Sequence, residues 1–248
     1  MSKTILITGG SRGIGRAAAI LAGARGWNVA LTYLSNDSAA QDTAAAVEAA
    51  GGKALAIRAD AARLDDMRRA FDETEAAFGP IDGFVNNAGI GTQTGKIADK
   101  DPQEIARLVE INVLGALYGA REAARRMSRS RGGKGGVIVN MSSAAARLGM
   151  PGEGVDYAAT KGAMDTLTYG LSKELAPEGI RVNAIRPGLI ATEFHAAMGA
   201  PGRAERLGQS VPIGREGSAE EVGEAVVWLL SDAASYVAGA IVDVTGGR

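Results

Sequence analysis

Short apolar runs alternate along the chain with longer, alanine-rich amphipathic segments. The short runs have the length and β-branched content of strands, and the longer segments have the length and periodicity of helices. The pattern predicts strands within 4–8, 28–33, 53–60, 83–89, 137–143, 180–188 and 240–246. It predicts helices near 15–26, 38–52, 64–78, 102–128, 157–176 and 219–231.

Strand–helix alternation with short connections is typical of a parallel sheet that has helices on both faces. The strands are continuous apolar runs, as expected when both faces of the sheet are buried. The chain shows no internal repeat and no linker that would divide it. We therefore expect a single α/β domain over residues 1–248, a Rossmann-type doubly wound sheet of about seven parallel strands.

Composition narrows the classes of function. The 248 residues are 46% hydrophobic, which is enough for one well-buried domain. Lys plus Arg number 27 against 28 Asp plus Glu, so no strong field indicates a nucleic-acid or membrane partner. There is no cysteine and a single histidine, His195, so we expect no metal site. The N-terminal stretch lacks the pattern of a signal peptide and no run is long enough to span a bilayer, which predicts a cytoplasmic protein.

A glycine-rich stretch, "TGGSRGIG" (8–15), joins the first predicted strand to the first helix. Gly9, Gly13 and Gly15 allow a tight turn there and let a phosphate approach the backbone. The helix N-terminus adds free N–H groups and a positive dipole end. This context favours dinucleotide binding over a plain turn, and Ser11, Arg12 and Ile14 of the same loop would border the cofactor.

Other strand ends are also polar or rich in glycine. The carboxyl ends of parallel strands meet at one edge of a sheet, and ligands of doubly wound folds bind in the crevice outside that edge. We expect these strand ends to border the same crevice, namely Asp60-Ala61, "NNAG" (86–89), Ser142-Ser143 and "RPG" (186–188).

Tyr157 and Lys161 are four residues apart on a predicted helix and so share one of its faces. A free tyrosine, with a pKa near 10, is a poor acid or base at neutral pH. A neighbouring ammonium group would favour the phenolate and lower that pKa. The spacing alone is also compatible with two residues that merely share a helix face.

Several short motifs in this order on a βα pattern resemble the short-chain dehydrogenase/reductase superfamily over essentially the full length. They are "TGGSRGIG", "NNAG", the Asn in "INVLG", the Ser in "NMSSAA", "YAATK" and "RPGLIAT". Among its members, the chain is most similar to bacterial glucose-1-dehydrogenase-like proteins and uncharacterised oxidoreductases. The resemblance implies an enzyme that transfers a hydride between a nicotinamide cofactor and a carbonyl or secondary-alcohol substrate.

The resemblance also implies roles for individual residues. Tyr157 would be the general acid and base, and Lys161 would lower its pKa and hold the nicotinamide ribose. Ser143 would orient the substrate oxygen, and Asn112 would anchor a water that links Lys161 to solvent. The stretch from Ser143 to Tyr157 is one residue longer than is common in the family, so Ser142 stays an alternative to Ser143.

Cofactor contacts follow from the same motifs. Asp60 and Ala61 would border the adenine, and Asn87, Ala88 and Gly89 the adenosine ribose. The nicotinamide and its carboxamide would contact Pro187, Gly188, Ile190 and Thr192.

The end of the second strand decides between NADP and NAD. Folds that prefer NAD place a carboxylate there to bind the ribose 2′-hydroxyl. Here Tyr33, Leu34 and Ser35 occupy that end, and no carboxylate appears until Asp37. Arg12 can offer its guanidinium to a 2′-phosphate. We therefore favour NADP(H), with NAD(H) as the alternative.

Some alternatives remain open at this stage. The stretch 191–212 is expected to form a substrate lid, in which His195 is interpreted as lid surface, with substrate contact the alternative. Phe194, Met198, Arg203 and Arg206 of this lid fit a sugar, a small keto compound or an acyl carrier equally well. The resemblance suggests a homotetramer, with interfaces through the helices near 102–128 and 157–176 and through the last strand. A catalytically silent cofactor sensor or scaffold of the same fold is the alternative function.

Overall fold

The computed structural model describes residues 2–248; Met1 of the predicted domain lies outside the described residues. Its parallel strands are β1 (Thr4–Ile7), β2 (Asn28–Tyr33), β3 (Lys53–Arg58), β4 (Gly83–Asn86), β5 (Gly136–Met141), β6 (Ile180–Pro187) and β7 (Ile241–Val244). Within these residues they form one 7-stranded sheet in the order β3-β2-β1-β4-β5-β6-β7. The expected doubly wound α/β fold is confirmed.

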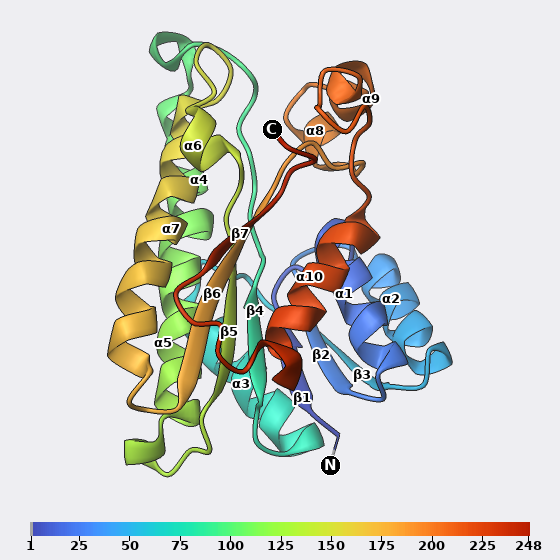
Figure 1. The fold of residues 1–248 in the computed structure, drawn as a ribbon, viewed down its shortest axis with the longest axis vertical. Helices are drawn as coiled ribbons and strands as arrows, with labels where there is room; N and C mark the ends of the chain where they lie inside the picture. The colour runs from blue at the N-terminus through green and yellow to red at the C-terminus, as the bar shows by residue number, and fades with distance from the viewer. Residues whose placement is uncertain (1) are drawn as a thin grey trace.

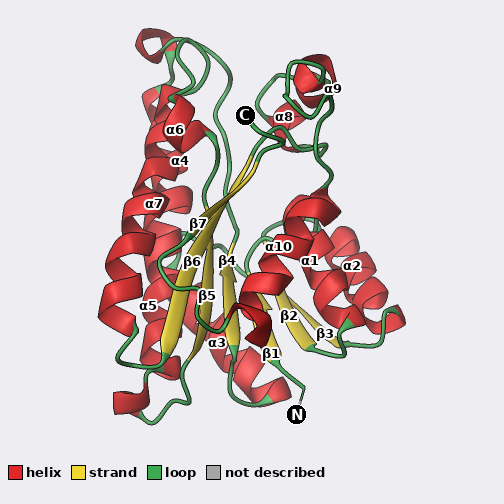
Figure 2. Cartoon of the chain, viewed as in Figure 1, coloured by secondary structure: helices red, strands yellow, loops and turns green. Residues whose placement is uncertain are grey.

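Helices cover both faces of the sheet (Figures 1 and 2). One face carries α1 (Gly13–Ala24), α2 (Asp37–Ala49) and α10 (Ala219–Leu230). The other carries α3 (Leu64–Phe78), α4 (Pro102–Val109), α5 (Ala116–Met127) and α7 (Val155–Leu175). Shorter helices are α6 (Ala145–Leu148), α8 (Phe194–Ala197) and α9 (Arg203–Gly208), and 3-10 turns lie at Ile97–Asp99, Arg129–Arg131 and Asp232–Ala234. Among residues 2–248, no helix is both long and apolar enough to cross a bilayer.

The central strands are largely apolar because their side chains alternate between two buried faces. Ile5 and Ile7 of β1 pack with α1 and α10, whereas Leu6 between them packs with α3 and α5. In β4, Val85 likewise belongs to the core with α1 and α10, and Phe84 to the core with α3 and α5. Period-2 alternation therefore places every residue of these strands in a core.

Strand order reverses at β1, which pairs with β2 on one side and with β4 on the other. The connections leaving β1 and β4 diverge over opposite faces of the sheet. This divergence opens a crevice at the carboxyl edge of the strands. The short helices α8 and α9, in the segment 191–212 that the sequence predicts to be a lid, lie above the same edge (Figure 1).

The predicted helix 102–128 is interrupted, which corrects the sequence-based expectation. A π-helical turn at Glu110–Gly115 separates α4 from α5. Such turns carry one extra residue per turn and cluster at functional sites. The sequence pattern predicted one uninterrupted helix here and did not reveal the turn. The lid also contains two short helices where the sequence predicted none.

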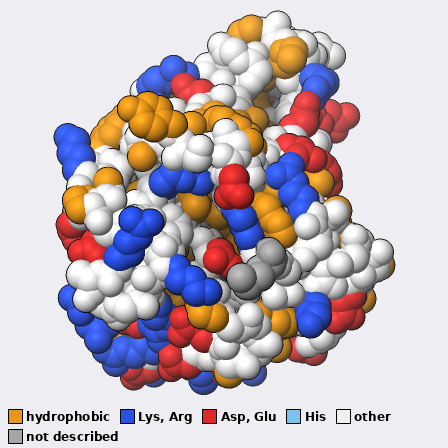
Figure 3. Space-filling model, turned by 60° about the horizontal axis from the view of Figure 1, so that its bottom comes forward, with side chains coloured by type: hydrophobic (Ala, Val, Ile, Leu, Met, Phe, Trp, Pro, Cys, Tyr) orange, Lys and Arg blue, Asp and Glu red, His pale blue; other side chains and the backbone are white. Residues whose placement is uncertain are grey.

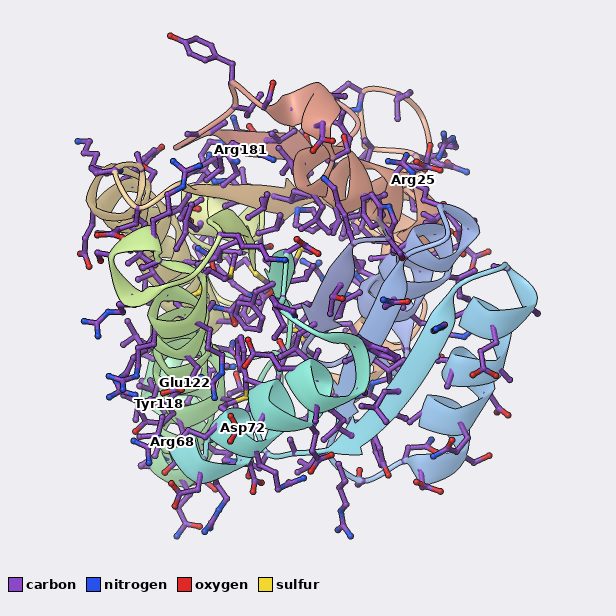
Figure 4. All side chains as sticks on the ribbon, turned by 90° about the horizontal axis from the view of Figure 1, so that it is seen from below. Arg25, Arg68, Asp72, Tyr118, Glu122 and Arg181 are labelled. Carbon is purple, nitrogen blue, oxygen red and sulfur yellow. The ribbon has the colours of Figure 1, made fainter. Side chains whose placement is uncertain are left out.

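The opposite, amino-terminal edge of the sheet carries mutually paired charges. Lys, Arg, Asp and Glu side chains are interspersed over this part of the surface (Figure 3). Arg68, Asp72 and Glu122 lie together beside α3 and α5 (Figure 4). Arg126 forms ion pairs with both Asp72 and Glu122, and only 3% of the Glu122 side chain is exposed. These pairs join α3 to α5 far from the crevice.

Candidate active site

A cavity of about 1100 Å³ lies at the carboxyl edge of the sheet. This volume slightly exceeds the usual range for small-molecule sites, which is about 300–1,000 Å³. Every residue predicted to bind cofactor lines it, namely Gly9, Ser11, Arg12, Gly13, Ile14, Gly15, Tyr33, Leu34, Ser35, Asp60, Ala61, Asn87, Ala88, Gly89, Tyr157, Lys161, Pro187, Gly188, Ile190 and Thr192. Ser143 lines it too, whereas Asn112 does not.

The glycine loop packs tightly against the start of α1. A Cβ at Gly15 would lie 2.4 Å from the Gly9 carbonyl oxygen and 2.6 Å from Asn87 Nδ2, so only glycine fits. Within the described residues, no side chain caps the N-terminus of α1. Its N–H groups and dipole therefore remain available to an anion beside the cavity, which suits the pyrophosphate of a dinucleotide.

The ends of β1 and β4 are bonded to each other at the floor of the cavity. The Thr8 hydroxyl accepts hydrogen bonds from the backbone N–H groups of Asn87 and Ala88, both at 3.0 Å. Asn87 Nδ2 donates to the carbonyl oxygens of Thr8 at 2.8 Å and Gly9 at 3.0 Å. Sequence reasoning missed Thr8, although its place at the end of the first strand was a signal. The Asn87 side chain thus supports the glycine loop while the residue lines the cavity.

Tyr157 and Lys161 lie on one face of α7, where both are buried and line the cavity. Lys161 Nζ lies 5.7 Å from the centroid of the Tyr157 ring and donates to the Met141 carbonyl oxygen at 2.8 Å. Burial raises the pKa of Tyr157 to about 12, although the Ser143 hydroxyl acts in the opposite direction. Burial lowers the pKa of Lys161 to about 8, against the attraction of Asp165. The expected lowering of the Tyr157 pKa by Lys161 is therefore not seen in this structure, because desolvation of the phenol dominates.

The two adjacent serines have different surroundings. Ser142 is buried, and its hydroxyl lies 2.7 Å from Asp165 Oδ1 and 3.1 Å from the Lys161 carbonyl oxygen. Ser143 is half-buried, lines the cavity, and accepts a hydrogen bond from the Ala145 N–H at 3.1 Å. The hydroxyl of Ser143 is therefore the one beside the Tyr157 phenol.

Asn112 lies in the π-helical turn, buried behind the cavity wall. Its Oδ1 accepts from the Ile90 N–H at 2.9 Å, and its Nδ2 donates to the Ile90 carbonyl oxygen at 2.9 Å. A Cβ at Gly89 would lie 3.3 Å from Asn112 Oδ1 and 3.5 Å from Lys161 Nζ. Asn112 therefore holds the segment after β4 in place, and its amide and the Lys161 ammonium both lie against Gly89.

Ion pairing also shapes the predicted adenine end of the cavity. Asp60 accepts hydrogen bonds from Arg107 at 2.8 Å and from the Ala62 N–H at 3.0 Å. Burial favours the neutral acid, but these two hydrogen bonds prevail and hold the pKa of Asp60 below its ordinary value. No sequence signal connects Arg107 to this site, because 47 residues separate it from Asp60.

A carboxylate lies near the end of β2 after all. The Tyr33 hydroxyl donates to Asp37 Oδ1 at 2.5 Å, and this hydrogen bond raises the pKa of Tyr33. Arg12 is exposed and lines the cavity, as does Tyr33. The guanidinium of Arg12 and the carboxylate of Asp37 therefore both lie close to this end of the cavity.

Mostly apolar side chains surround Tyr157 at the lid end. The Phe194 ring centroid lies 5.5 Å from that of Tyr157, and Ile90, Leu148, Met150 and Met198 also line this part. His195 is half-buried and lines the cavity, and burial lowers its pKa. Arg203 also lines the cavity but forms an ion pair with Glu153. Arg206 is not among the lining residues.

Known proteins resemble this chain in sequence and in fold. Residues 9–248 match the family described as enoyl-(acyl carrier protein) reductase. An uncharacterized oxidoreductase, YgfF of Escherichia coli K12, is 49% identical over 243 residues, 98% of each chain. A 3-ketoacyl-(acyl-carrier-protein) reductase from Brucella melitensis, complexed with NADH, has a TM-score of 0.91 at 32% identity, with 99% of this chain and 98% of that one covered. A short chain dehydrogenase from Burkholderia cenocepacia, in complex with NADP, has a TM-score of 0.89 at 35% identity, with 99% and 97% covered.

Proposed function

The chain belongs to the short-chain dehydrogenase/reductase superfamily, and we propose that it transfers a hydride between NADP(H) and an uncharged carbonyl or secondary-alcohol substrate, with Tyr157 as general acid and base. The observation that carries the proposal is the convergence of Ser143, Tyr157 and Lys161 on one cavity that also contains the open N-terminus of α1.

In reduction, negative charge develops on the substrate oxygen and requires a hydrogen-bond donor and a proton. A bound nicotinamide would supply or accept the hydride. Tyr157, protonated at neutral pH, would donate its proton to the oxygen, and Ser143 would donate a hydrogen bond to the same atom. In oxidation, Tyr157 would take the proton from the alcohol.

Lys161 and Asn112 would support the tyrosine. With a pKa of about 8, Lys161 is mostly cationic at neutral pH and would stabilise the phenolate once the proton has left. Its ammonium would also bind the nicotinamide ribose hydroxyls. Asn112, whose amide lies against Gly89 together with the Lys161 ammonium, would anchor a water that returns the proton from solvent.

NADP(H) remains the favoured cofactor. The Arg12 guanidinium is exposed beside the cavity and could form a charge-assisted pair with a 2′-phosphate. Asp37, which is hydrogen bonded to Tyr33, opposes this preference because its charge would repel the phosphate. NAD(H) is the alternative, and the relative affinities of the two cofactors decide between them.

The lining at the lid end supports an apolar, uncharged substrate over a sugar. Ile90, Met150 and Phe194 pack beside Tyr157, and Arg203 is neutralised by Glu153. A sugar would leave most of its hydroxyls without partners against such a wall, which is costly.

We place the enzyme in the cytoplasm. We also expect a homotetramer that uses α5, α7 and β7, since Leu114, Leu117 and Tyr169 expose apolar surface around α5 and α7.

A panel of apolar ketones, keto acids and sugars, each with NADPH and NADH, tests the proposal through consumption of the reduced cofactor. Tyr157→Phe keeps the ring packing but removes the proton donor, so turnover should fall at least roughly 100-fold while cofactor affinity stays within about twofold. Turnover of no compound, with tight cofactor binding, would instead support the silent sensor or scaffold. Turnover by Tyr157→Phe close to that of the wild type would exclude Tyr157 as the proton donor.

A further inference from the structure

Asp156, the residue before Tyr157, forms a buried ion pair outside the proposed catalytic set. Asp156 Oδ1 lies 3.5 Å from Lys100 Nζ, and the two side chains are only 2% and 3% exposed. Lys100 comes from the connection between the 3-10 turn Ile97–Asp99 and α4. The pair therefore joins the first turn of α7 to a segment 56 residues earlier in the chain.

Thr92 bridges the two charges. Its hydroxyl donates to Asp156 Oδ2 at 2.6 Å and accepts from Lys100 Nζ at 2.8 Å. Lys100 Nζ also donates to the carbonyl oxygen of Gln93. Asp156 Oδ1, by contrast, accepts no hydrogen bond from residues 2–248. Burial of an ion pair with an incompletely bonded carboxylate contributes little to stability, so its position in the molecule needs another explanation.

The segment that this pair holds, residues 91–95, contacts the lid and the cavity. The Thr94 N–H donates to the Met198 carbonyl oxygen at 3.1 Å, and the Gly95 N–H donates to that of Glu153 at 2.9 Å. A Cβ at Gly91 would lie 2.6 Å from Met198 Cγ, so the Met198 side chain packs directly on this backbone. Thr94 and Met198 both line the cavity.

A continuous chain of contacts thus runs from the catalytic helix to the lid. Asp156 fixes Lys100 and Thr92, these fix the 91–95 segment, and the segment fixes Met198. Because Asp156 adjoins Tyr157, the same contacts relate the position of the lid to that of the phenol.

We propose that Asp156, Lys100 and Thr92 are positioning residues that set the 91–95 segment and the lid against Tyr157, and thereby the width of the substrate end of the cavity. The kinetic consequence rests on the proposed function, whereas the structural consequence does not. Weakening this connection should loosen the lid and impair binding of the carbonyl substrate, and it should leave the cofactor end of the cavity unchanged.

Amide hydrogen exchange tests the connection without any substrate. Thr92→Val keeps the shape and both charges but removes the bridging hydroxyl. We expect the amides of Thr94, Gly95 and Met198 to exchange about 3- to 10-fold faster than in the wild type, the factor for loss of about one hydrogen bond. Thr74→Val is the matched control, since Thr74 is equally buried but bonds only to Ala70 within α3.

Asp156→Asn gives an independent variant, because it removes the charge partner of Lys100 while it nearly preserves volume. It should accelerate exchange at the same amides. Rates equal to those of Thr74→Val, or a uniform acceleration over the whole chain, would overturn the proposal.

Kinetics supply the second readout. With the most active ketone of the substrate panel, Thr92→Val should raise KM at least about 5-fold and change the NADPH dissociation constant less than about twofold. An unchanged KM, or a matching loss of NADPH affinity, would count against positioning of the lid. If the wild type reduces no ketone, the proposed function fails, but the exchange rates still decide whether the pair holds the lid.

Discussion

The hydroxyl of Ser142 lies 2.7 Å from the carboxylate of Asp165, which in turn forms an ion pair with Arg186. This group joins the end of β5, α7 and β6 at the wall of the cavity, which Ser142 lines. It explains how two adjacent serines can have different tasks, since one hydroxyl takes part in packing and the other remains beside Tyr157.

The first prediction separates these two serines. Ser143→Ala should lower turnover by about 10- to 1000-fold with little change in stability, because it removes a donor to the substrate oxygen. Ser142→Ala should lower the free energy of unfolding by about 1–3 kcal/mol, because it leaves Asp165 with one fewer donor. Turnover and urea unfolding of both variants provide the check, and the reverse pattern would assign the catalytic role to Ser142.

The second prediction concerns pH and Lys161. Burial lowers the pKa of Lys161 to about 8 from 10.5, so between these values the unfolded chain binds more protons than the folded one. Titration of Lys161 therefore raises the free energy of unfolding by about 3 kcal/mol as the pH rises from about 8 to 10.5. Below pH 8 this added stability is absent. Tyr157, with a pKa raised to about 12 from 10.0, acts in the opposite direction between those two values.

Lys161→Met should abolish most of the rise that Lys161 causes. Urea unfolding at about pH 7.5 and about pH 9.5 measures it as the difference between wild type and variant. Lys173→Met, an exposed substitution on the same helix, is the control and should follow the wild type. An equally steep rise in Lys161→Met would show that Lys161 is not desolvated in the folded protein.

The third prediction concerns cofactor choice. Arg12→Ala should weaken NADPH binding by about 10- to 150-fold and NADH binding only slightly, because a charge-assisted contact contributes about 1.5–3 kcal/mol. Relative to the wild type, Asp37→Asn should shift the ratio of the two affinities toward NADPH by about fivefold or less, because it removes a negative charge near the phosphate site. Fluorescence titration of both cofactors measures these ratios. Equal weakening of both cofactors by Arg12→Ala would mean that Arg12 does not contact a 2′-phosphate.

The fourth prediction concerns the glycine loop. Gly15→Ala would place a Cβ 2.4 Å from the Gly9 carbonyl oxygen, a backbone atom that cannot move without opening the loop. Stability should fall by about 1–3 kcal/mol, and both cofactors should bind more weakly. Gly170→Ala is the matched control, since a Cβ there meets nothing within 4 Å, and in a helix it should be neutral or stabilising. Thermal unfolding and cofactor titration measure both effects.

The sequence by itself determined the sheet, most of its helices and the glycine loop. Each of these depends on neighbours within a few residues: apolar runs for strands, 3.6-residue periodicity for helices, and glycines between a strand and a helix. The convergence of Tyr157, Lys161 and Ser143 was also predictable, because parallel strands bring their carboxyl ends to one edge.

Only the tertiary structure decided which distant residues meet around that edge. Asp60 meets Arg107, and Asp156 meets Lys100, between elements that no local pattern relates. The π-helical turn that places Asn112 against Ile90 was equally invisible in the sequence. The physical reason is that such pairings depend on how whole helices pack on the sheet, and a shift of one residue in that packing would replace each partner by another.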